Sequence, residues 1–198
     1  LKMCLPDAEF VETELDQTPM FVNEDVNLIY LGPMTENTQE KVTEITVGVA
    51  SFDSMNPILS TNKNVQDITK LIYEPLLTLT SDYKIEACLA KEWAKQNNTT
   101  YIIKLKDNIR WADGEKFTAD DVKFTVDRLK EVNSIYTSNV AHIVSLEIVD
   151  DYTVQINLDQ EIPFFEYNLT FPIMSSQYYF DKTFDANIVP IGTGMYKV

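Results

Sequence analysis

A mixed fold of strands and helices, either α+β or α/β, is predicted by three patterns in this sequence. Apolar residues alternate with other residues over 44–50, which is typical of a strand. A capped amphipathic helix is expected over 118–132, and alternating segments on both sides of 150–151 are typical of an antiparallel pair. These elements do not alternate as repeated βαβ units do, and no internal repeat of about 20–50 residues is visible. Solenoids and propellers are therefore not expected.

The segment 1–43 differs in texture from the rest of the chain. Acidic residues and prolines are frequent in it, and it has little regular periodicity. We predict that it is a tether or a peripheral segment. Its apolar run over 26–31 would suit a strand laid on the body of the protein equally well.

The folded body is expected to begin at Glu44 with the first strand. The stretch 51–64 is rich in Ser, Asp, Asn and Pro and is predicted to be a loop. Apolar residues at helical spacing follow over 65–74, and Pro75 is expected to end that helix. A short strand over 76–80 then precedes a turn.

The second half of the chain contains the clearest signals. Alternation over 100–105 predicts a strand that ends in a turn at 107–108. Thr118 is expected to be the N-cap of a helix, with Asp121 as its capping partner. The apolar stripe of this helix is Val122, Val126, Leu129 and Val132.

Composition excludes several classes of protein. The chain has 198 residues, 44% of them hydrophobic, which is enough for a substantial core. Its 16 basic and 31 acidic residues give a net charge of −15, which would repel phosphate backbones, so nucleic-acid binding is not expected. No run approaches the roughly 18 apolar residues of a spanning helix, and Cys4 lacks the small neighbours of a lipid-acylated cysteine. Any membrane anchor is therefore expected to lie outside these residues.

Catalytic and metal chemistry find little support in the sequence. His142 is the one histidine and has no second ligand at metal-binding spacing, so no metal site or cofactor is predicted. Gly192 and Gly194 lack the residues that complete a phosphate-binding loop. Paired carboxylates remain as an enzymatic alternative, because a glycosidase needs two of them. Caps and turns account for the available ones, which are Asp120, Asp121, Asp150 and Asp151.

An ordered set of motifs resembles the oligopeptide-binding family of solute receptors that serve ABC importers. The motif W-A-D-G over 111–114 is followed by F-T-A-D-D-V over 117–122, and shorter blocks precede and follow them in the family's order. The resemblance runs from about Glu44 to Val198. It implies a type II periplasmic-binding-protein fold, with a first lobe built from 44–74 and 177–198 and an α+β lobe inserted over 75–176. Family members are far longer, so the resemblance also implies an incomplete fold, an N-terminal fragment.

The resemblance implies a function of binding without turnover. The ligand would be a small solute, typically an oligopeptide in such receptors, and the partners would be ABC permease subunits in the membrane. The protein would be extracytoplasmic, at the cell surface or in the periplasm, and tethered as a lipoprotein or by another anchor. An uncovered lobe would let the fragment self-associate. Two alternatives remain: a carboxylate-dependent hydrolase, and a surface adhesion or sensing module on the same scaffold.

The resemblance also places a ligand site. Receptors of the family hold the peptide main chain with the segment after the first strand, which here carries Asn56, Ser60, Thr61, Asn62 and Lys63. Backbone N–H and C=O groups of this loop would supply the affinity. Three further residues are expected to line the cleft, with core packing as the alternative role for each: Tyr136, Phe171 and Met174.

Overall fold

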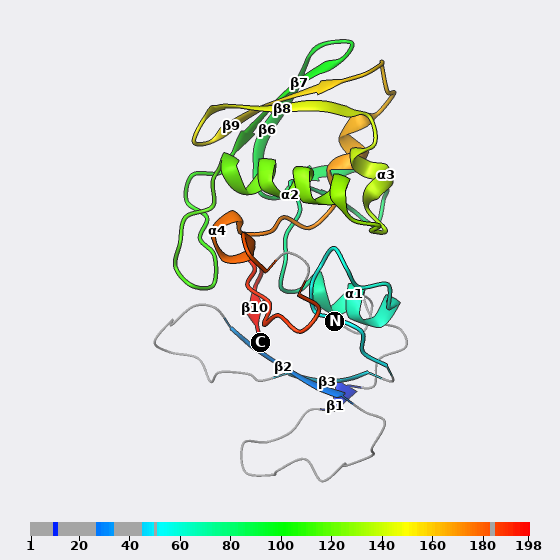
Figure 1. The fold of residues 1–198 in the computed structure, drawn as a ribbon, viewed down its shortest axis with the longest axis vertical. Coiled ribbons are helices and arrows are strands. Elements are labelled where there is room, and N and C mark those ends of the chain that lie inside the picture. Colours follow the sequence, from blue (N-terminus) through cyan, green and yellow to red (C-terminus); the bar gives the residue numbers. More distant parts are fainter. Residues whose placement is uncertain (1–9, 12–26, 34–44, 50, 183–184) are drawn as a thin grey trace.

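The computed structural model describes residues 10–11, 27–33, 45–49, 51–182 and 185–198. Figure 1 shows two parts stacked along the long axis, one around α2 and one around α1, joined by extended segments beside α4. In the described ranges every strand pair is antiparallel. Cys4 and most of 1–43 lie outside the described residues.

The first part contains a sheet that joins distant segments of the chain. Its order is β1 (Phe10–Val11), β3 (Ile45–Val49), β2 (Asn27–Pro33) and β10 (Tyr196–Lys197). The strand predicted over 44–50 is thus confirmed as β3, and Val47 and Val49 are buried. The described parts of the expected tether are strands of this sheet.

Helix α1 (Lys63–Thr69) begins and ends earlier than the sequence pattern predicted. It begins earlier because the Asn62 side chain accepts hydrogen bonds from the amides of Asn64 and Val65 and so caps the helix. It ends before Pro75 because tighter turns take over after Thr69, with Ile72 N–H donating to the Thr69 carbonyl at 3.0 Å. Ile72 is nevertheless fully buried, which explains the helical spacing of apolar residues.

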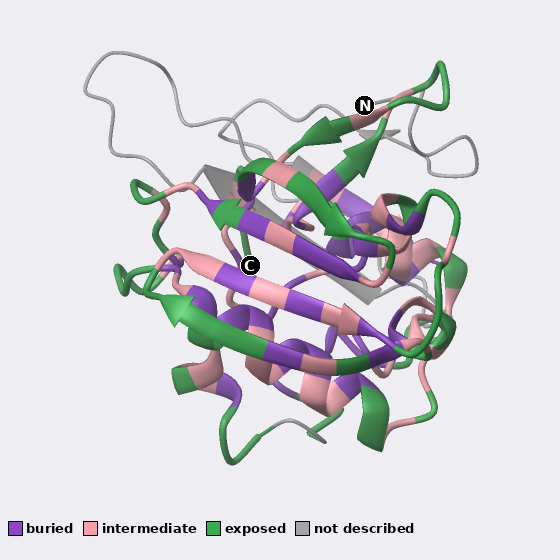
Figure 2. Cartoon of the chain, turned by 90° about the horizontal axis from the view of Figure 1, so that it is seen from above, coloured by how far each residue is buried: buried purple, intermediate pink, exposed green. Residues whose placement is uncertain are grey.

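The second part is built on a four-stranded sheet covered on one face by α2 (Ala119–Glu131). The sheet order is β6 (Ala90–Asn97), β7 (Thr100–Leu105), β9 (Thr153–Leu158) and β8 (Ile143–Asp150). Figure 2 shows buried residues alternating with more exposed ones along its inner strands. The predicted pairing of β8 with β9 is confirmed, and β4 (Leu77–Leu79) with β5 (Ile85–Ala87) forms a separate hairpin.

Strand β6 was not predicted, and its burial explains why. Only Ala90 is buried in this edge strand, so it lacks the apolar alternation that marks a half-buried strand. The hairpin partner of β7 is this upstream strand. The remaining short helices are α3 (Thr137–Val140), the 3-10 helix η1 (Phe165–Leu169) and α4 (Ser176–Tyr179).

The turn from the W-A-D-G motif into α2 has the predicted form. Gly114 has φ of +93°, and Trp111 packs edge-on against Phe117 with ring centroids 6.1 Å apart. Thr118 and Asp121 form the predicted capping box. Trp111 and Phe117 are buried, so this motif positions the start of α2 from the core side.

Candidate functional site

The loop between β3 and α1 is organised by one carboxylate, that of Asp53. Its Oδ1 accepts hydrogen bonds from Ser54 N–H at 2.8 Å and Ser60 Oγ at 2.7 Å. Its Oδ2 accepts from the amides of Thr61 at 2.7 Å and Asn62 at 3.1 Å. Partial burial acts to raise the pKa of Asp53, but these hydrogen bonds outweigh it and hold that pKa below its usual range. The carboxylate therefore fixes the main chain over 60–62.

Asn56 fixes the preceding turn of the same loop. Its Oδ1 accepts from the amide of Ile58, and its carbonyl accepts from the amides of Leu59 and Ser60, each at 3.2 Å. Its Nδ2 donates to the Asp185 carbonyl at 3.4 Å, which ties the loop to the returning segment. Asn56 is fully buried and Ser60 is 2% exposed, so both support the loop rather than form its surface.

The amides of this loop are thus engaged inside the protein. Five successive N–H groups, those of residues 58–62, donate to Asn56 or Asp53. The resemblance, in contrast, predicts that both N–H and C=O groups of the loop face a ligand. Among the described contacts, the Thr61 carbonyl accepts no hydrogen bond, whereas the N–H groups of residues 60–62 all donate. Within 60–62, the main-chain group left unengaged is therefore an acceptor, the Thr61 carbonyl.

The other predicted contact residues fall into two groups. Lys63 Nζ pairs with Asp67 at 2.6 Å, whereas Tyr136 is half-buried, and burial, with a smaller contribution from Asp67, raises the pKa of its hydroxyl. Tyr136 packs against the core. Phe171 and Met174 are fully buried, which is the core-packing alternative, and Met174 N–H donates to Thr125 Oγ1 at 2.9 Å.

Two chain crossings connect the two parts of the molecule, and they lie side by side. Pro75 and Pro172 form an antiparallel bridge, and Ile173 N–H donates to the Glu74 carbonyl at 3.0 Å. The last segment is held against the same region, because Gly194 N–H donates to the Ile72 carbonyl at 2.8 Å. Both crossings are thus hydrogen-bonded to neighbouring main chain.

A buried pair of tyrosines ties the crossings together. The hydroxyls of Tyr73 and Tyr179 are hydrogen-bonded, and Ile191 N–H donates to the Tyr179 hydroxyl at 3.2 Å. Tyr73 is 2% exposed and Tyr179 is fully buried. Burial raises the pKa of Tyr179 to about 12, so its hydroxyl stays neutral near pH 7. The junction therefore contains uncharged tyrosine hydroxyls whose hydrogen bonds are made within the protein.

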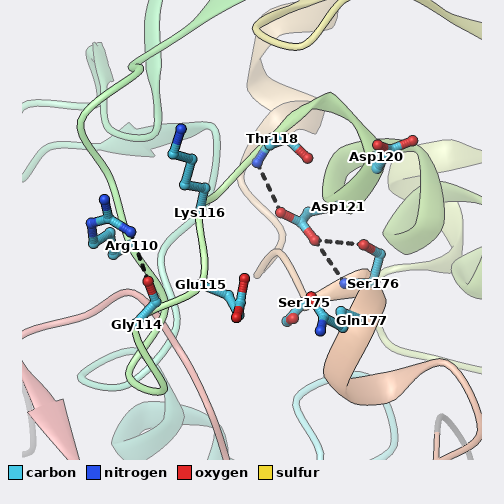
Figure 3. Close-up of a pocket in the computed structure, with 10 residues that line it drawn as sticks. All are labelled: Arg110, Gly114, Glu115, Lys116, Thr118, Asp120, Asp121, Ser175, Ser176 and Gln177. Atoms are coloured by element: carbon cyan, nitrogen blue, oxygen red, sulfur yellow. Dashed lines mark hydrogen bonds between the residues drawn. The ribbon is translucent and has the colours of Figure 1, made fainter.

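A polar pocket of about 470 Å³ lies where the W-A-D-G turn meets the first turns of α2 and α4 (Figure 3). The two motifs of the resemblance contribute four of its ten lining residues, although the sequence pattern predicted only a structural role for them. Its exposed charges have both signs, and Arg110 donates to the Gly114 carbonyl of its own turn at 2.8 Å. The lining residues are Arg110, Gly114, Glu115, Lys116, Thr118, Asp120, Asp121, Ser175, Ser176 and Gln177.

Asp121 is the buried carboxylate of this pocket, and it is fully occupied by protein donors. Figure 3 shows it between Thr118 and Ser176. Its Oδ2 accepts from Thr118 N–H at 2.9 Å and from Trp111 Nε1 at 3.1 Å. Its Oδ1 accepts from Ser176 N–H at 2.7 Å and Ser176 Oγ at 2.8 Å. A carboxylate held in this way serves structure rather than general acid–base chemistry.

The remaining reactive groups also have structural or surface positions. His142 Nδ1 lies 3.0 Å from Asp159 Oδ1 at the surface. Burial and the nearby Glu74 raise the pKa of Cys88 to about 11, so its thiol is not a nucleophile near neutral pH. In the part of the chain that is described, no three His, Cys, Asp or Glu side chains gather as a metal site would require. No helix of these ranges is long and apolar enough to span a membrane.

Comparison with known sequences adds a family match. Residues 84–198 match the bacterial extracellular solute-binding proteins, family 5 Middle. The chain is 30% identical over 162 residues to the glutathione-binding protein GsiB of Salmonella typhimurium, and this alignment covers 78% of this chain and 32% of that protein. The chain thus spans about a third of the length of the curated relatives it matches.

Solved structures share the fold. NikZ of Campylobacter jejuni, in complex with Ni(L-His), aligns with a TM-score of 0.66 and 30% identity over 74% of this chain and 31% of that one. DppA of Helicobacter pylori, in complex with the peptide STSA, aligns with a TM-score of 0.62 and 25% identity over 73% of this chain and 34% of that one. The predicted type II periplasmic-binding-protein fold is thereby confirmed for the aligned part.

Proposed function

The chain belongs to the bacterial extracellular solute-binding proteins of family 5, and from this premise we propose that it captures a small peptide for an ABC importer and releases it unchanged. The family match over 84–198 carries the proposal. The organised loop over 53–62 supports it, because a fixed main-chain surface recognises peptides irrespective of their side chains.

The peptide class is favoured by the relatives that share 25–30% identity with this chain. GsiB is named for glutathione, itself a small peptide, and DppA was solved with the peptide STSA. NikZ, with Ni(L-His), favours a metal–amino acid complex as a second candidate. The hydrolase alternative gains no support, because protein donors occupy Asp121 and the Asp150 carboxylate accepts from the Tyr152 amide at 2.8 Å.

The contacts with the solute are proposed to come from the exposed part of the predicted set. Thr61 and Lys63 are exposed, and Asn62 and Tyr136 are half-buried. Asn56 and Ser60 would hold the loop beneath them. Phe171 and Met174, which are fully buried, would act through the packing of the inserted lobe.

The division into lobes is also a proposal. Residues 44–74 and 177–198 would form one lobe and 75–176 an inserted one, with 1–43 peripheral to both. The two crossings meet where Tyr73 and Tyr179 are bonded, so these lobes should move as one body. Closure over the solute would then involve a surface outside these 198 residues.

The partners would be the permease subunits of the importer. The protein would act outside the cytoplasm, at the cell surface or in the periplasm, held there as a lipoprotein or by another membrane anchor. Adhesion or sensing on the same scaffold would need no permease. Loss of solute uptake on deletion of the gene, restored by the intact gene, separates transport from that alternative.

The proposed function is tested by incubating the natural-length protein with di- to pentapeptides. Binding should raise its melting temperature by mass action, and mass spectrometry should recover the peptides intact. A parallel incubation with nickel and L-histidine tests the second candidate. Cleaved peptides would show a hydrolase, and no shift with any solute would contradict the receptor function.

The 198-residue chain alone is expected to bind these peptides weakly. A pocket typically encloses about 70–90% of a small ligand, and one loop surface provides far less contact while the entropic cost of association remains. We also propose that it self-associates, since Phe180 and Met195 are each 74% exposed. Calorimetry and light scattering check both points. Micromolar binding by a monomeric chain would show that this surface is complete without further residues.

A further inference from the structure

The hydrogen bonds within the loop over 53–62 use the N–H donors of residues 58–62. The Thr61 and Asn62 amides, which would otherwise face outward as donors, are turned toward the Asp53 carboxylate at 2.7 and 3.1 Å. The Asn62 side chain is also engaged, donating to the Ser51 carbonyl at 2.9 Å and capping α1. Within 60–62, what the main chain keeps for a solute is the Thr61 carbonyl.

The charges around the loop also favour a hydrogen-bond donor on the solute. The two lysines on α1 and beside it, Lys63 and Lys70, both pair with Asp67, at 2.6 and 2.7 Å. No ion pair to Asp53 occurs among the described residues. The hydrogen bonds of Asp53 spread its negative charge over the loop without neutralising it. A hydrogen-bond donor on the solute is therefore favoured here over an acceptor.

We propose that Asp53 is a positioning residue that makes the segment 60–62 an acceptor surface, so that the solute must present an N–H group to it. This rests on the proposed function, because it assigns a selectivity to the same site. Asp53 would not touch the solute. It would act by holding Thr61 and Asn62, so that binding needs no reordering of the loop.

The test uses the natural-length receptor and the tripeptide that it binds most tightly. In a set of analogues, each carries one N-methylated amide or amine. At one position the wild-type receptor should lose about tenfold in affinity, as for one lost hydrogen bond. Asp53→Ala should bind the parent peptide about tenfold or more weakly, and its penalty for that N-methyl group should shrink, because the released amides can bind acceptors instead. Asp53→Asn keeps one acceptor oxygen and should lie between the two.

Asp127→Ala is the matched control, since it removes the same charge from a surface ion pair with Lys123 on α2. It should keep both the affinity and the N-methyl penalty. A variant that merely misfolded would weaken all analogues by one factor, whereas the proposal requires the ratio to change. An unchanged ratio in Asp53→Ala, or no N-methyl penalty in the wild type, overturns this inference alone. A receptor that binds no peptide overturns the peptide function together with it.

Discussion

Replacing Gly192 with alanine is expected to destabilise the protein by about 4 kcal/mol or more, in the range reached only when backbone must move. A Cβ at this position would lie 1.8 Å from the Ile72 carbonyl oxygen and 2.5 Å from its carbonyl carbon. These are main-chain atoms of a fully buried residue, and the Gly192 carbonyl is itself held by the Ala112 amide at 3.0 Å. Neither the main chain at Gly192 nor that at Ile72 can move away without opening the junction between the two parts. Urea unfolding followed by circular dichroism measures the loss.

Gly114→Ala is the matched control for this prediction. Gly114 has φ of +93°, but a methyl group added there would meet no atom within 4 Å, so alanine at this position meets backbone strain alone. That strain should cost about 1 kcal/mol. Equal losses in the two variants would show that Gly192 does not approach the Ile72 peptide as closely as described.

Asp121→Ala is expected to cost about 3–5 kcal/mol, the range for removing one partner from a buried charged network. The change leaves the donors of Thr118, Trp111 and Ser176 without their acceptor. Trp111 is 2% exposed, so water cannot readily replace the carboxylate. The same change removes the capping box of α2 and its link to α4. Thermal and urea unfolding measure this loss.

Two further variants test whether the loss of stability comes from the hydrogen bonds of Asp121. Asp121→Asn keeps one acceptor oxygen, so it should lose the donors on one side of the group and show about half the effect. Asp120→Ala, at the exposed neighbouring position, should stay within about 0.5 kcal/mol of the wild type. A loss for Asp120→Ala as large as that for Asp121→Ala would assign the effect to helix-end charge instead.

The pH dependence of stability offers a separate check on Asp121. Burial raises its pKa, and the hydrogen bonds from Ser176, Thr118 and Trp111 only partly oppose that rise. The folded state therefore holds this proton more tightly than the unfolded state. Stability should fall as the pH rises from about 4 through the raised pKa, and Asp121→Ala should lack that component.

Elements whose signals lie within a few residues could be predicted from the sequence. Thr118 and Asp121 are three positions apart and form the capping box, and the β8–β9 pair is specified by alternation around one turn. Gly114 supplies the positive φ that its turn requires. The ordered motifs around these elements also identified the family. Each of these features depends on neighbours along the chain.

Contacts between distant segments were decided only by the tertiary structure. Strand β6 is an edge strand with one buried residue, so no apolar period marks it, and pairing with β7 defines it. Aromatic and methionine side chains suit a cleft and a core equally, and only long-range packing buries Phe171 and Met174 completely. The resemblance pointed to the loop after β3 as the proposed ligand site, yet the orientation of its amides depends on Asp53, eight and nine residues before Thr61 and Asn62. A hydrogen-bond direction is a property of folded geometry, because the residue types alone allow the backbone to present donors or acceptors.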